Sequence, residues 1–581
     1  MPDEHHRTEL ADGMRIEWNA PIPVDDGTVL RADIFRPDDS APHPVLMTYG
    51  PYGKGLHFGE GFPAQWQKLA EHADVVDGST NKYQAWEVVD PERWVPHGYV
   101  CIRIDSRGSG WTPGQIDPFS PRETRDYYEA IEWAAAQPWS NGRIGLNGVS
   151  YYAMNQWMVA ARRPPHLAAI CPFEGAADLY RDATHHGGIV SEFWATWYPF
   201  QVMNVQYGLG DKGRTNPNTG ESIAGAETLD EETRAANRID LRAAIAAHPL
   251  DDEFYAQRRA DLGAIEVPVL SAANWGGQGL HSRGNFTGFT DAGSTQKWLE
   301  VHGLEHWTEF YTAYGRDLQK RFFDHFLLGA DNGWDRQPPV QLQVRDVSGG
   351  FSTRAEREWP LARTSWTAFH LDFARRALVT EPPSEASAVE FDALGAGVTL
   401  LAEPFSEPTE ITGPSATTLT LRSSTTDADL FVVLRLFDPA GTEVLFTAAV
   451  EPRAPLSQGW LRASHRKLDP ARSSPYQPWH THDVRQPLEP GAPYRVDVEI
   501  WPTCVVAPAG YRLGLTILGR DYDNGLGEPH PMIYQRPMTG SGCWWHTDAV
   551  DRPVATFGGR TTLESTPEQP ALLLLPIVPE S

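Results

Sequence analysis

The sequence predicts an α/β domain with a mostly parallel sheet and an inserted helical cap, followed by an all-β domain. Three observations lead to this prediction. Buried strand-like runs alternate with helical patterns up to about residue 175, and strands resume from about residue 265. Residues 176–264 lack that alternation and carry apolar helical patches. Beyond Pro339, short alternating strands are separated by turns, as in a β-sandwich or jelly roll.

The first part opens with two alternating runs, Met14–Val24 and Thr28–Arg36, which flank a turn and predict an antiparallel hairpin. Helical spacing of apolar residues predicts helices over Arg122–Gln137 and Glu309–Leu328. Residues 55–91 show neither pattern, and we interpret them as an excursion that frames a pocket. Strands of the α/β sheet are expected at Pro44–Tyr49, Tyr99–Asp105, Arg143–Asn147, Leu167–Cys171, Val267–Ala272 and Lys297–His302.

These patterns predict the domain organisation. Residues 1–175 and 265–335 form the α/β domain, residues 176–264 form the cap, and residues 336–581 form the C-terminal β-domain. Strands of the last domain are expected at Val340–Val347, Trp366–Leu371, Ala416–Arg422, Ala428–Phe437, Tyr494–Ile500 and Arg512–Leu518. A length of 581 residues is too great for a single core and agrees with this division.

Composition limits the classes of function. The chain is 41% hydrophobic and 11% aromatic, which indicates a globular protein. Its formal net charge of −27 argues against nucleic acid or an anionic membrane as a partner. The N-terminus lacks the apolar core of a signal peptide and no run is long enough to span a bilayer, so a cytoplasmic location is expected. The sequence leaves open whether the chain forms a homo-oligomer.

No metal or cofactor is expected. The cysteines at 101, 171, 504 and 543 have no Cys-x-x-Cys spacing, which argues against a zinc site or a disulfide framework. The adjacent pair His185 and His186 lacks a third ligand nearby in the sequence, so a structural role in the cap is favoured over metal binding.

Ser150 stands at the junction of an expected strand and an expected helix, in the run Asn147-Gly-Val-Ser-Tyr-Tyr-Ala153. Such a nucleophile elbow exposes the serine hydroxyl, and the amide N–H of Tyr151 points to where an oxyanion forms. The alternative is a glycine-rich turn with a surface serine. The flanking elements and the expected partners favour the nucleophile.

A nucleophilic serine needs a histidine base, which in α/β-hydrolases follows the last strand of the sheet. His306 lies in the loop after the expected strand Lys297–His302, whereas His302 is still in the strand and is expected to be structural. Tyr52, in a turn after a buried strand, is placed where its phenol could be a second oxyanion donor.

The motifs resemble those of the cocaine esterase-like serine hydrolases, which are related to X-prolyl dipeptidyl aminopeptidases, α-amino-acid ester hydrolases and macrotetrolide hydrolases. They are Gly-Val-Ser-Tyr at the elbow, Gln-Pro-Trp-Ser-Asn-Gly before it, Asp-Ser-Arg-Gly-Ser-Gly after the preceding strand, and Pro-Tyr-Gly-Lys upstream. The resemblance covers almost the whole chain. It implies a serine hydrolase with Ser150 as nucleophile, His306 as base, and the Tyr151 amide and Tyr52 hydroxyl as the oxyanion hole. It also makes Asp105 a structural acid.

Two positions depart from that family. Ala153 replaces the last glycine of the elbow, and Gly277 stands where the family carries its catalytic aspartate. Another group must therefore orient His306, or the triad is degraded. We predict Glu174, in the loop after the expected strand Leu167–Cys171, with Asp178 as the alternative. Glu305 adjoins the base in the chain and is disfavoured, and the remaining possibilities are a triad without an acid and an acid at another position.

The expected reaction is the cleavage of a small-molecule carboxylic ester. Gly276–Leu280 offers no acidic side chain for a substrate ammonium, and little sequence precedes the first strand, so a peptidase or amidase is the alternative. A catalytically weak, ligand-binding hydrolase fold is the second alternative. An apolar substrate pocket is expected from four tryptophans, although a core role between cap and sheet is equally compatible with them: Trp194, Trp197, Trp275 and Trp307.

Overall fold

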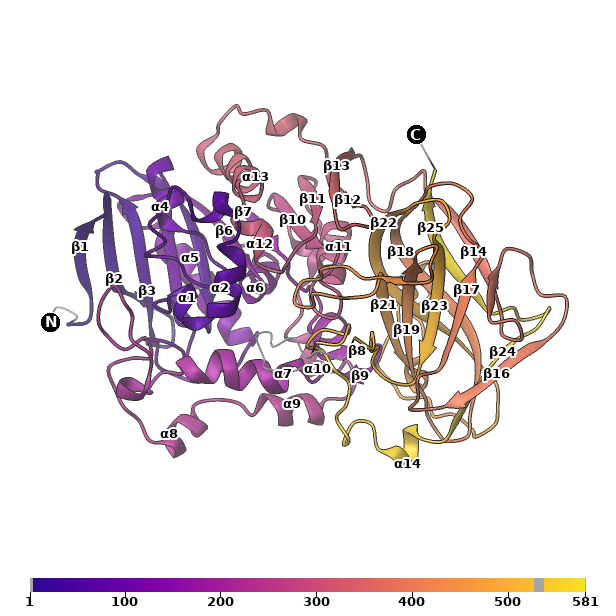
Figure 1. Cartoon of the computed structure of the whole chain (residues 1–581). Coiled ribbons are helices and arrows are strands. Elements are labelled where there is room, and N and C mark those ends of the chain that lie inside the picture. The colour runs from indigo at the N-terminus through magenta and orange to yellow at the C-terminus, as the bar shows by residue number, and fades with distance from the viewer. Residues whose placement is uncertain (1–3, 527–537, 580–581) are drawn as a thin grey trace.

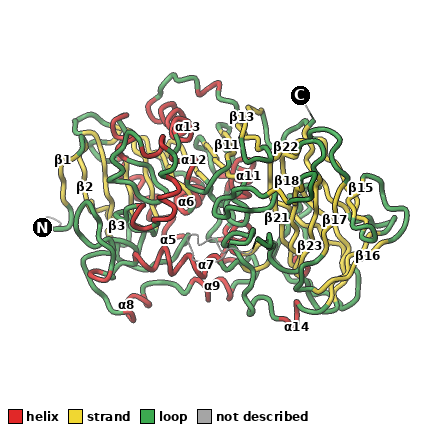
Figure 2. The backbone as a smooth tube through the Cα atoms, viewed as in Figure 1, coloured by secondary structure: helices red, strands yellow, loops and turns green. Residues whose placement is uncertain are grey.

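The computed structural model describes residues 4–526 and 538–579. Two bodies lie side by side, an α/β body that contains the N-terminus and an all-β body that contains the C-terminus (Figure 1). Helices gather in the first body, and strands make up most of the second (Figure 2). The fold class predicted from the sequence is therefore confirmed.

The α/β body is built on an 11-stranded sheet with the order β1-β2-β3-β5-β4-β6-β7-β10-β11-β12-β13. Its centre, from β5 to β12, is parallel, while β1 to β3 and β13 pair antiparallel at the two edges. The strands are β1 (Arg7–Ala11), β2 (Met14–Pro23), β3 (Val29–Pro37), β4 (His43–Gly50), β5 (Val100–Asp105), β6 (Ser140–Val149), β7 (Leu167–Phe173), β10 (Val269–Asn274), β11 (Lys297–His302), β12 (Val340–Arg345) and β13 (Phe351–Glu356).

Helices pack against this sheet through apolar faces. In α5, Ser120 caps the N-terminus by accepting a hydrogen bond from Glu123 N, and Tyr127, Ile131 and Ala134 are buried on one face. The predicted long helix after β11 is broken at Thr312, which caps α13. The helices are α1 (Phe58–Gly61), α2 (Pro63–Leu69), α3 (Ala73–Val76), α4 (Pro91–Trp94), α5 (Pro121–Ala135), α6 (Tyr151–Ala160), α11 (Ser282–Asp291), α12 (Thr308–Tyr311) and α13 (Ala313–Phe323).

The segment between β7 and β10 forms the cap, which lies along the lower side of the view in Figure 1 and reaches the β-domain. It consists of short helices, as predicted, and a small hairpin that the sequence did not reveal. Arg462 N in the β-domain donates to Gly187 O in that hairpin at 2.9 Å. The elements are β8 (His185–His186), β9 (Ile189–Val190), α7 (Phe193–Trp197), α8 (Glu231–Ala236), α9 (Leu241–Ala247) and α10 (Glu253–Ala256).

One predicted strand belongs to a different sheet from the one expected. The sequence pattern predicts Val340–Val347 as a strand of the C-terminal domain, but β12 (Val340–Arg345) pairs in parallel with β11, with Leu299 opposite Val340. The alternating pattern is the same in either sheet, and only long-range pairing decides which sheet a strand joins. The main sheet therefore extends to Glu356, beyond the predicted boundary at residue 336.

In the described residues, the β-domain is a 12-stranded, mostly antiparallel arrangement with its own apolar core, and only β15 and β17 pair in parallel. Its longest pairing joins β18 to β22. Its elements are β14 (Ser365–Asp372), β15 (Ala377–Val379), β16 (Ser387–Asp392), β17 (Val398–Ala402), β18 (Thr409–Ser423), β19 (Asp429–Phe437), β20 (Glu443–Val444), β21 (Ser457–Arg462), β22 (Tyr494–Ala507), β23 (Arg512–Leu518), α14 (Val554–Phe557), β24 (Arg560–Ser565) and β25 (Leu572–Val578).

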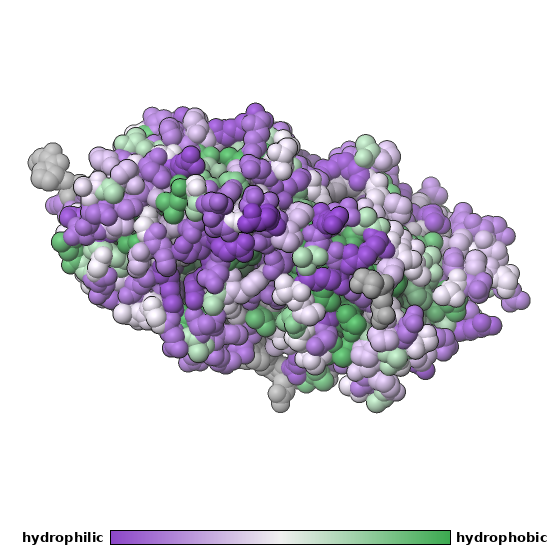
Figure 3. All heavy atoms as spheres, turned by 90° about the horizontal axis from the view of Figure 1, so that it is seen from above, coloured by the Kyte–Doolittle hydropathy of each residue, from purple (hydrophilic) through white to green (hydrophobic). Residues whose placement is uncertain are grey.

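The surface face in Figure 3 is mainly hydrophilic, with hydrophobic residues in small groups. Among the described residues, no helix is both long and apolar enough to cross a membrane. In the same part of the chain, no cluster of three or more His, Cys, Asp or Glu is arranged to hold a metal ion. All four cysteines are buried, as small hydrophobic residues would be, and none of them forms a disulfide with another.

Candidate active site

Ser150 occupies a tight turn between β6 and α6. Its backbone angles are φ 62° and ψ −117°, a region that non-glycine residues rarely adopt and that is often found at functional sites. The turn needs small neighbours because strand and helix approach closely. A Cβ on Gly148 would lie 2.5 Å from Tyr152 Cβ, and one on Gly175 would lie 2.5 Å from Ala153 Cβ. The absence of a side chain at Gly175 thus leaves room for Ala153.

The Ser150 hydroxyl contacts a histidine that the sequence analysis did not name. Ser150 Oγ lies 3.2 Å from Nε2 of His281. His281 comes from the loop between β10 and α11, four residues after Gly277, where the resembling family carries its aspartate. Its ring stacks on the ring of His306, with centroids 4.9 Å apart and planes 13° apart. Two histidine rings therefore lie at the nucleophile.

His306 is held between two buried carboxylates. Its Nδ1 is 2.8 Å from Glu174 Oε2, and its Nε2 is 3.0 Å from Glu87 Oε1. The structure thus brings together His306 and the predicted acid, Glu174. It places the second ring nitrogen of His306 on Glu87 rather than on Ser150.

A buried network fixes the position of Glu174. Its Oε1 is 3.0 Å from His302 Nε2 and accepts a hydrogen bond from Asn274 Nδ2 at 3.2 Å. His302 in turn contacts Glu300 through Nδ1 at 2.7 Å. Asn274 ends β10 and His302 ends β11, so the ends of two neighbouring parallel strands support one carboxylate. His302 therefore supports the carboxylate from the strand, as its predicted structural role requires.

The two histidines have opposite electrostatic environments. Burial would lower the pKa of His306, but the charges of Glu174 and Glu87 raise it to about 10. Burial and the neighbouring His306 hold the pKa of His281 well below its usual value. Burial also raises the pKa of Glu87 to about 7, whereas the positive charge of His306 outweighs burial and lowers the pKa of Glu174. In the resting site, His306 is thus the charged histidine and His281 the neutral one.

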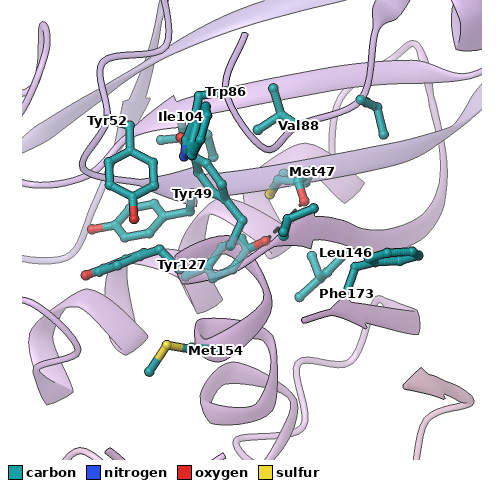
Figure 4. Close-up of a cluster of buried hydrophobic side chains, with 14 of the residues drawn as sticks. Met47, Tyr49, Tyr52, Trp86, Val88, Ile104, Tyr127, Leu146, Met154 and Phe173 are labelled. Atoms are coloured by element: carbon teal, nitrogen blue, oxygen red, sulfur yellow. Dashed lines mark hydrogen bonds between the residues drawn. The ribbon is translucent and has the colours of Figure 1, made fainter. Parts of the chain in front are cut away.

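Tyr52 lies beside the nucleophile, as predicted. Its hydroxyl accepts a hydrogen bond from Trp197 Nε1 at 3.1 Å and also interacts with the Ser150 side chain. Burial keeps the pKa of Tyr52 well above its usual value, so the phenol retains its proton. Figure 4 shows Tyr52 and Trp86 among the buried side chains next to the sheet. The side chain of Tyr151 points elsewhere and donates to Glu123 Oε2 at 2.6 Å, which leaves its backbone amide as the group relevant to an oxyanion.

The cavity at Ser150 is small. Its volume is about 20 Å³, room for roughly one water molecule. Two of its walls are the cap and the β-domain. It is lined by Trp86, Glu87, Ser150, Phe193, Trp197, Gln201, Leu280, His281, His306, Ala449, Val450 and Trp544.

The four tryptophans predicted to form the pocket have different positions. Trp197 lines the cavity at Ser150, and Trp194 borders a separate cavity of about 340 Å³. Trp275 is fully buried in an apolar cluster with Phe286 and Trp359, and Trp307 is fully buried in the main core. Trp275 and Trp307 thus occupy the core positions that the sequence analysis held equally compatible with them.

The alternative acid and the predicted structural acid are both engaged elsewhere. Asp178 forms ion pairs with Arg181 at 2.8 Å and with Arg259 at 3.0 Å in the cap. Asp105 accepts a hydrogen bond from Lys54 N at 2.7 Å and lies 3.3 Å from Lys54 Nζ. Asp105 therefore ties the Pro-Tyr-Gly-Lys turn, which carries Tyr52, to the end of β5.

Sequence and structure comparisons decide the family. The X-Pro dipeptidyl-peptidase (S15 family) domain matches residues 26–308, and the X-Pro dipeptidyl-peptidase C-terminal non-catalytic domain matches residues 332–564. The crystal structure of a CocE/NonD family hydrolase from Staphylococcus aureus is 31% identical, with a TM-score of 0.84 over 99% of this chain and 97% of that one. The chain belongs to the CocE/NonD family of serine hydrolases.

Two curated relatives are more distant. A Mycobacterium bovis protein whose provisional name is serine esterase is 23% identical over 95% of this chain and 97% of its own length. The cocaine esterase of Rhodococcus sp. is 26% identical over 62% of this chain and 63% of its own length. The family suggested by the sequence motifs is thereby confirmed, and with it the assignment as a serine hydrolase.

Sequence reasoning missed two residues of this CocE/NonD site, His281 and Glu87. His281 follows Leu280 directly, so a search for any titratable group in the loop after β10, rather than for an acid alone, would have found it. Glu87 lies in the irregular segment before α4, where no periodicity indicates which side chains face inward. Its left-handed backbone, φ 62°, is visible only in the structure.

Proposed function

We propose that this protein hydrolyses a carboxylic ester through an acyl-enzyme on Ser150. The observation that carries the proposal is the position of Ser150: it lies in a strained elbow and shares one buried cavity with His306 and His281. Serine hydrolases need a nucleophile, a histidine base and an oriented carboxylate in contact with that base. Glu174, 2.8 Å from His306 Nδ1, supports the last of these roles.

In the proposed reaction, Ser150 Oγ attacks the ester carbonyl and transfers its proton to Nε2 of His306, whose Nδ1–H is held by Glu174. The carbonyl oxygen becomes an oxyanion, which accepts hydrogen bonds from the Tyr151 amide and the Tyr52 hydroxyl. His306 then gives the proton to the departing alkoxide. Water hydrolyses the acyl-enzyme by the same steps in the same order. For the first transfer, Nε2 must exchange Glu87 for Ser150.

An ester is favoured over a peptide with a free amino terminus. The loop after β10 presents Gly276, Gly277 and Gln278, none of which carries a negative charge that could form an ion pair with a substrate ammonium. Glu87 does line the cavity, but its carboxylate is engaged by His306 and interacts with the side chain of Trp86. Relatives named as esterases are among the matches, whereas others are named as X-Pro dipeptidyl-peptidases, so the choice needs an experiment.

A fluorophosphonate probe tests the nucleophile, because it labels a serine only when that serine is activated. We expect stoichiometric labelling of Ser150 in the wild type and none in Ser150→Ala. Turnover of p-nitrophenyl esters of graded chain length, compared with amino-acid p-nitroanilides, then tests the bond type. Faster cleavage of the anilides would replace the esterase proposal by an amidase. An unlabelled Ser150 in folded protein would reject acyl-enzyme chemistry.

A further inference from the structure

Glu87 is a buried carboxylate that the proposed triad does not use. Its side chain is 2% exposed, and it lines the Ser150 cavity. Oε1 contacts His306 Nε2 at 3.0 Å, and the side chain of Trp86 also interacts with the carboxylate. Its backbone carbonyl accepts from Val149 N at 3.1 Å, next to the nucleophile. A left-handed backbone and the burial of a carboxylate both cost free energy, so a functional reason is expected.

The contact with Glu87 creates a problem for a base at His306. Both ring nitrogens of His306 face carboxylate oxygens, so the ring is stable as an imidazolium that carries a proton on each nitrogen. A base needs a free electron pair on Nε2. The Nε2 proton must therefore leave before Ser150 can be activated, and few groups beside it can accept a proton.

Most of the other titratable groups around Glu87 are unable to accept the Nε2 proton of His306. Tyr52, Tyr152 and Tyr311 have raised pKa values and keep their own protons. The pKa of Glu174 is lowered because the histidine charges outweigh burial, and the pKa of His281 is held well below its usual value by burial. Neither group holds an extra proton at neutral pH. Glu87 differs because burial raises its pKa to about 7.

We propose that Glu87 is a positioning residue that prepares the base, by binding Nε2 of His306 in the resting site and accepting the Nε2 proton when substrate enters. The inference rests on the proposed function, and it adds a group that the resembling family's triad does not contain. Substrate expels water from the cavity, and a drier site disfavours a charged pair relative to a neutral one.

The proton balance is complete without an outside partner. The proton on His306 Nε2 moves to Glu87 Oε1, which converts an imidazolium and a carboxylate into a neutral imidazole and a carboxylic acid. His306 keeps its Nδ1–H on Glu174. Nε2 then takes the Ser150 proton as the Oγ–C bond forms and the carbonyl electron pair moves to oxygen. His306 passes that proton to the leaving alkoxide, and Glu87 returns its own proton after turnover.

The pH profile of wild-type kcat/KM tests the proposal directly. The pair of His306 and Glu87 carries the same number of protons before and after the transfer. We therefore expect kcat/KM to stay constant between about pH 7.5 and pH 9.5. If the proton instead went to solvent, log kcat/KM would climb with unit slope towards pH 10, where His306 titrates. Such a climb would overturn the proposal, and this measurement needs no variant.

The variant Glu87→Gln provides the second test, because an amide cannot accept the proton. In this variant we expect kcat/KM to rise about tenfold between pH 7 and pH 8.5 instead of staying constant. The rise should follow the deprotonation of His306, which is measured from the NMR resonance of its Cε1–H. Glu309→Gln is the matched control. Glu309 is a buried carboxyl whose pKa is likewise raised by burial to about 7, but it accepts from Gln343. That variant should keep the flat profile.

A flat profile in Glu87→Gln would also overturn the inference. Failure of the proposed function looks different, since neither ester turnover nor fluorophosphonate labelling would then occur at any pH. If the protein is labelled by the fluorophosphonate but cleaves esters poorly, the labelling rate is measured at the same pH values. A rate that is constant with pH or one that rises with pH then has the same meaning as for kcat/KM. If Glu87→Gln does not fold, the wild-type profile alone decides.

Discussion

Ser150 Oγ and His281 Nε2 lie 3.2 Å apart, so the resting nucleophile is hydrogen-bonded to a histidine from the loop after β10. Nε2 of His306 is meanwhile bound to Glu87. The two groups that react in the proposed mechanism are thus each held by a different partner. Substitutions in the site separate the roles of these two partners, His281 and Glu87.

His281 is expected to position Ser150 rather than to act as its base, because its buried Nδ1 has no hydrogen-bond partner within residues 4–526 and 538–579 that could orient the ring or stabilise a charge. We predict that His281→Asn lowers kcat/KM about tenfold, the value of one hydrogen bond. His306→Asn should lower it by about 10²–10⁴-fold, the contribution of a general base. Equal losses in steady-state assays, or a larger loss at His281, would make His281 the base.

Glu174 is predicted to be the acid of the triad. Glu174→Gln should lower kcat by about 10³–10⁴-fold with little change in KM, because the amide cannot hold the required tautomer of His306. Asp178→Asn serves as the comparison, since Asp178 pairs with Arg181 and Arg259. It should cost about 3–5 kcal/mol in urea unfolding while the folded fraction keeps its turnover. The reverse pattern would move the acid to Asp178.

Tyr52 is predicted to donate to the oxyanion. Tyr52→Phe should reduce kcat by about 10²–10³-fold without weakening substrate binding, because the phenol acts on charge that develops in the transition state. Tyr49→Phe is a suitable control, because Tyr49 is buried in the same cluster (Figure 4). Its hydroxyl is directed at Asp126, 3.5 Å away. Its kcat should stay at the wild-type value. A Tyr52→Phe enzyme with normal kcat would remove Tyr52 from the oxyanion hole.

The local parts of the site could be predicted from sequence, and the long-range parts could not. The elbow at Ser150 follows from glycine and small-residue spacing, and Glu174 follows from its place directly after a buried strand. His281 and Glu87 reach the cavity through loops whose path depends on packing against the cap and the β-domain. For the same reason β12 joined the main sheet, because an alternating strand fits either sheet and only its partner decides.

A group of buried histidines lies between the cap and the β-domain. His186 Nδ1 is 2.8 Å from His546 Nε2, and His465 Nδ1 is 3.0 Å from His482 Nδ1. Burial, in several cases with nearby arginines or histidines, holds the pKa values below the usual value for histidine at five positions: His185, His186, His465, His480 and His482. These five histidines are neutral in the folded protein at neutral pH.

His480 allows the consequence for stability to be measured. Burial and the charge of Arg181 lower its pKa to about 3, whereas an unfolded histidine titrates near 6.5. Between those values the unfolded chain binds more protons at this position, so the free energy of unfolding falls as the pH falls. Above pH 6.5 the position contributes no pH dependence.

We therefore predict that His480→Gln makes the protein less sensitive to acid. Relative to wild type, its free energy of unfolding should rise by up to about 1.4 kcal/mol for each pH unit below 6.5, measured by urea unfolding at pH 7.5, 6 and 5. The free energy of unfolding of the variant is compared with that of wild type at each pH. Buried carboxyls with raised pKa values, such as Glu123, have the opposite pH dependence, but they are present in both proteins and cancel in the difference. His97→Gln, at an exposed position, should run parallel to wild type. A difference that does not change with pH would show that His480 takes up its proton at the same pH in the folded and the unfolded chain.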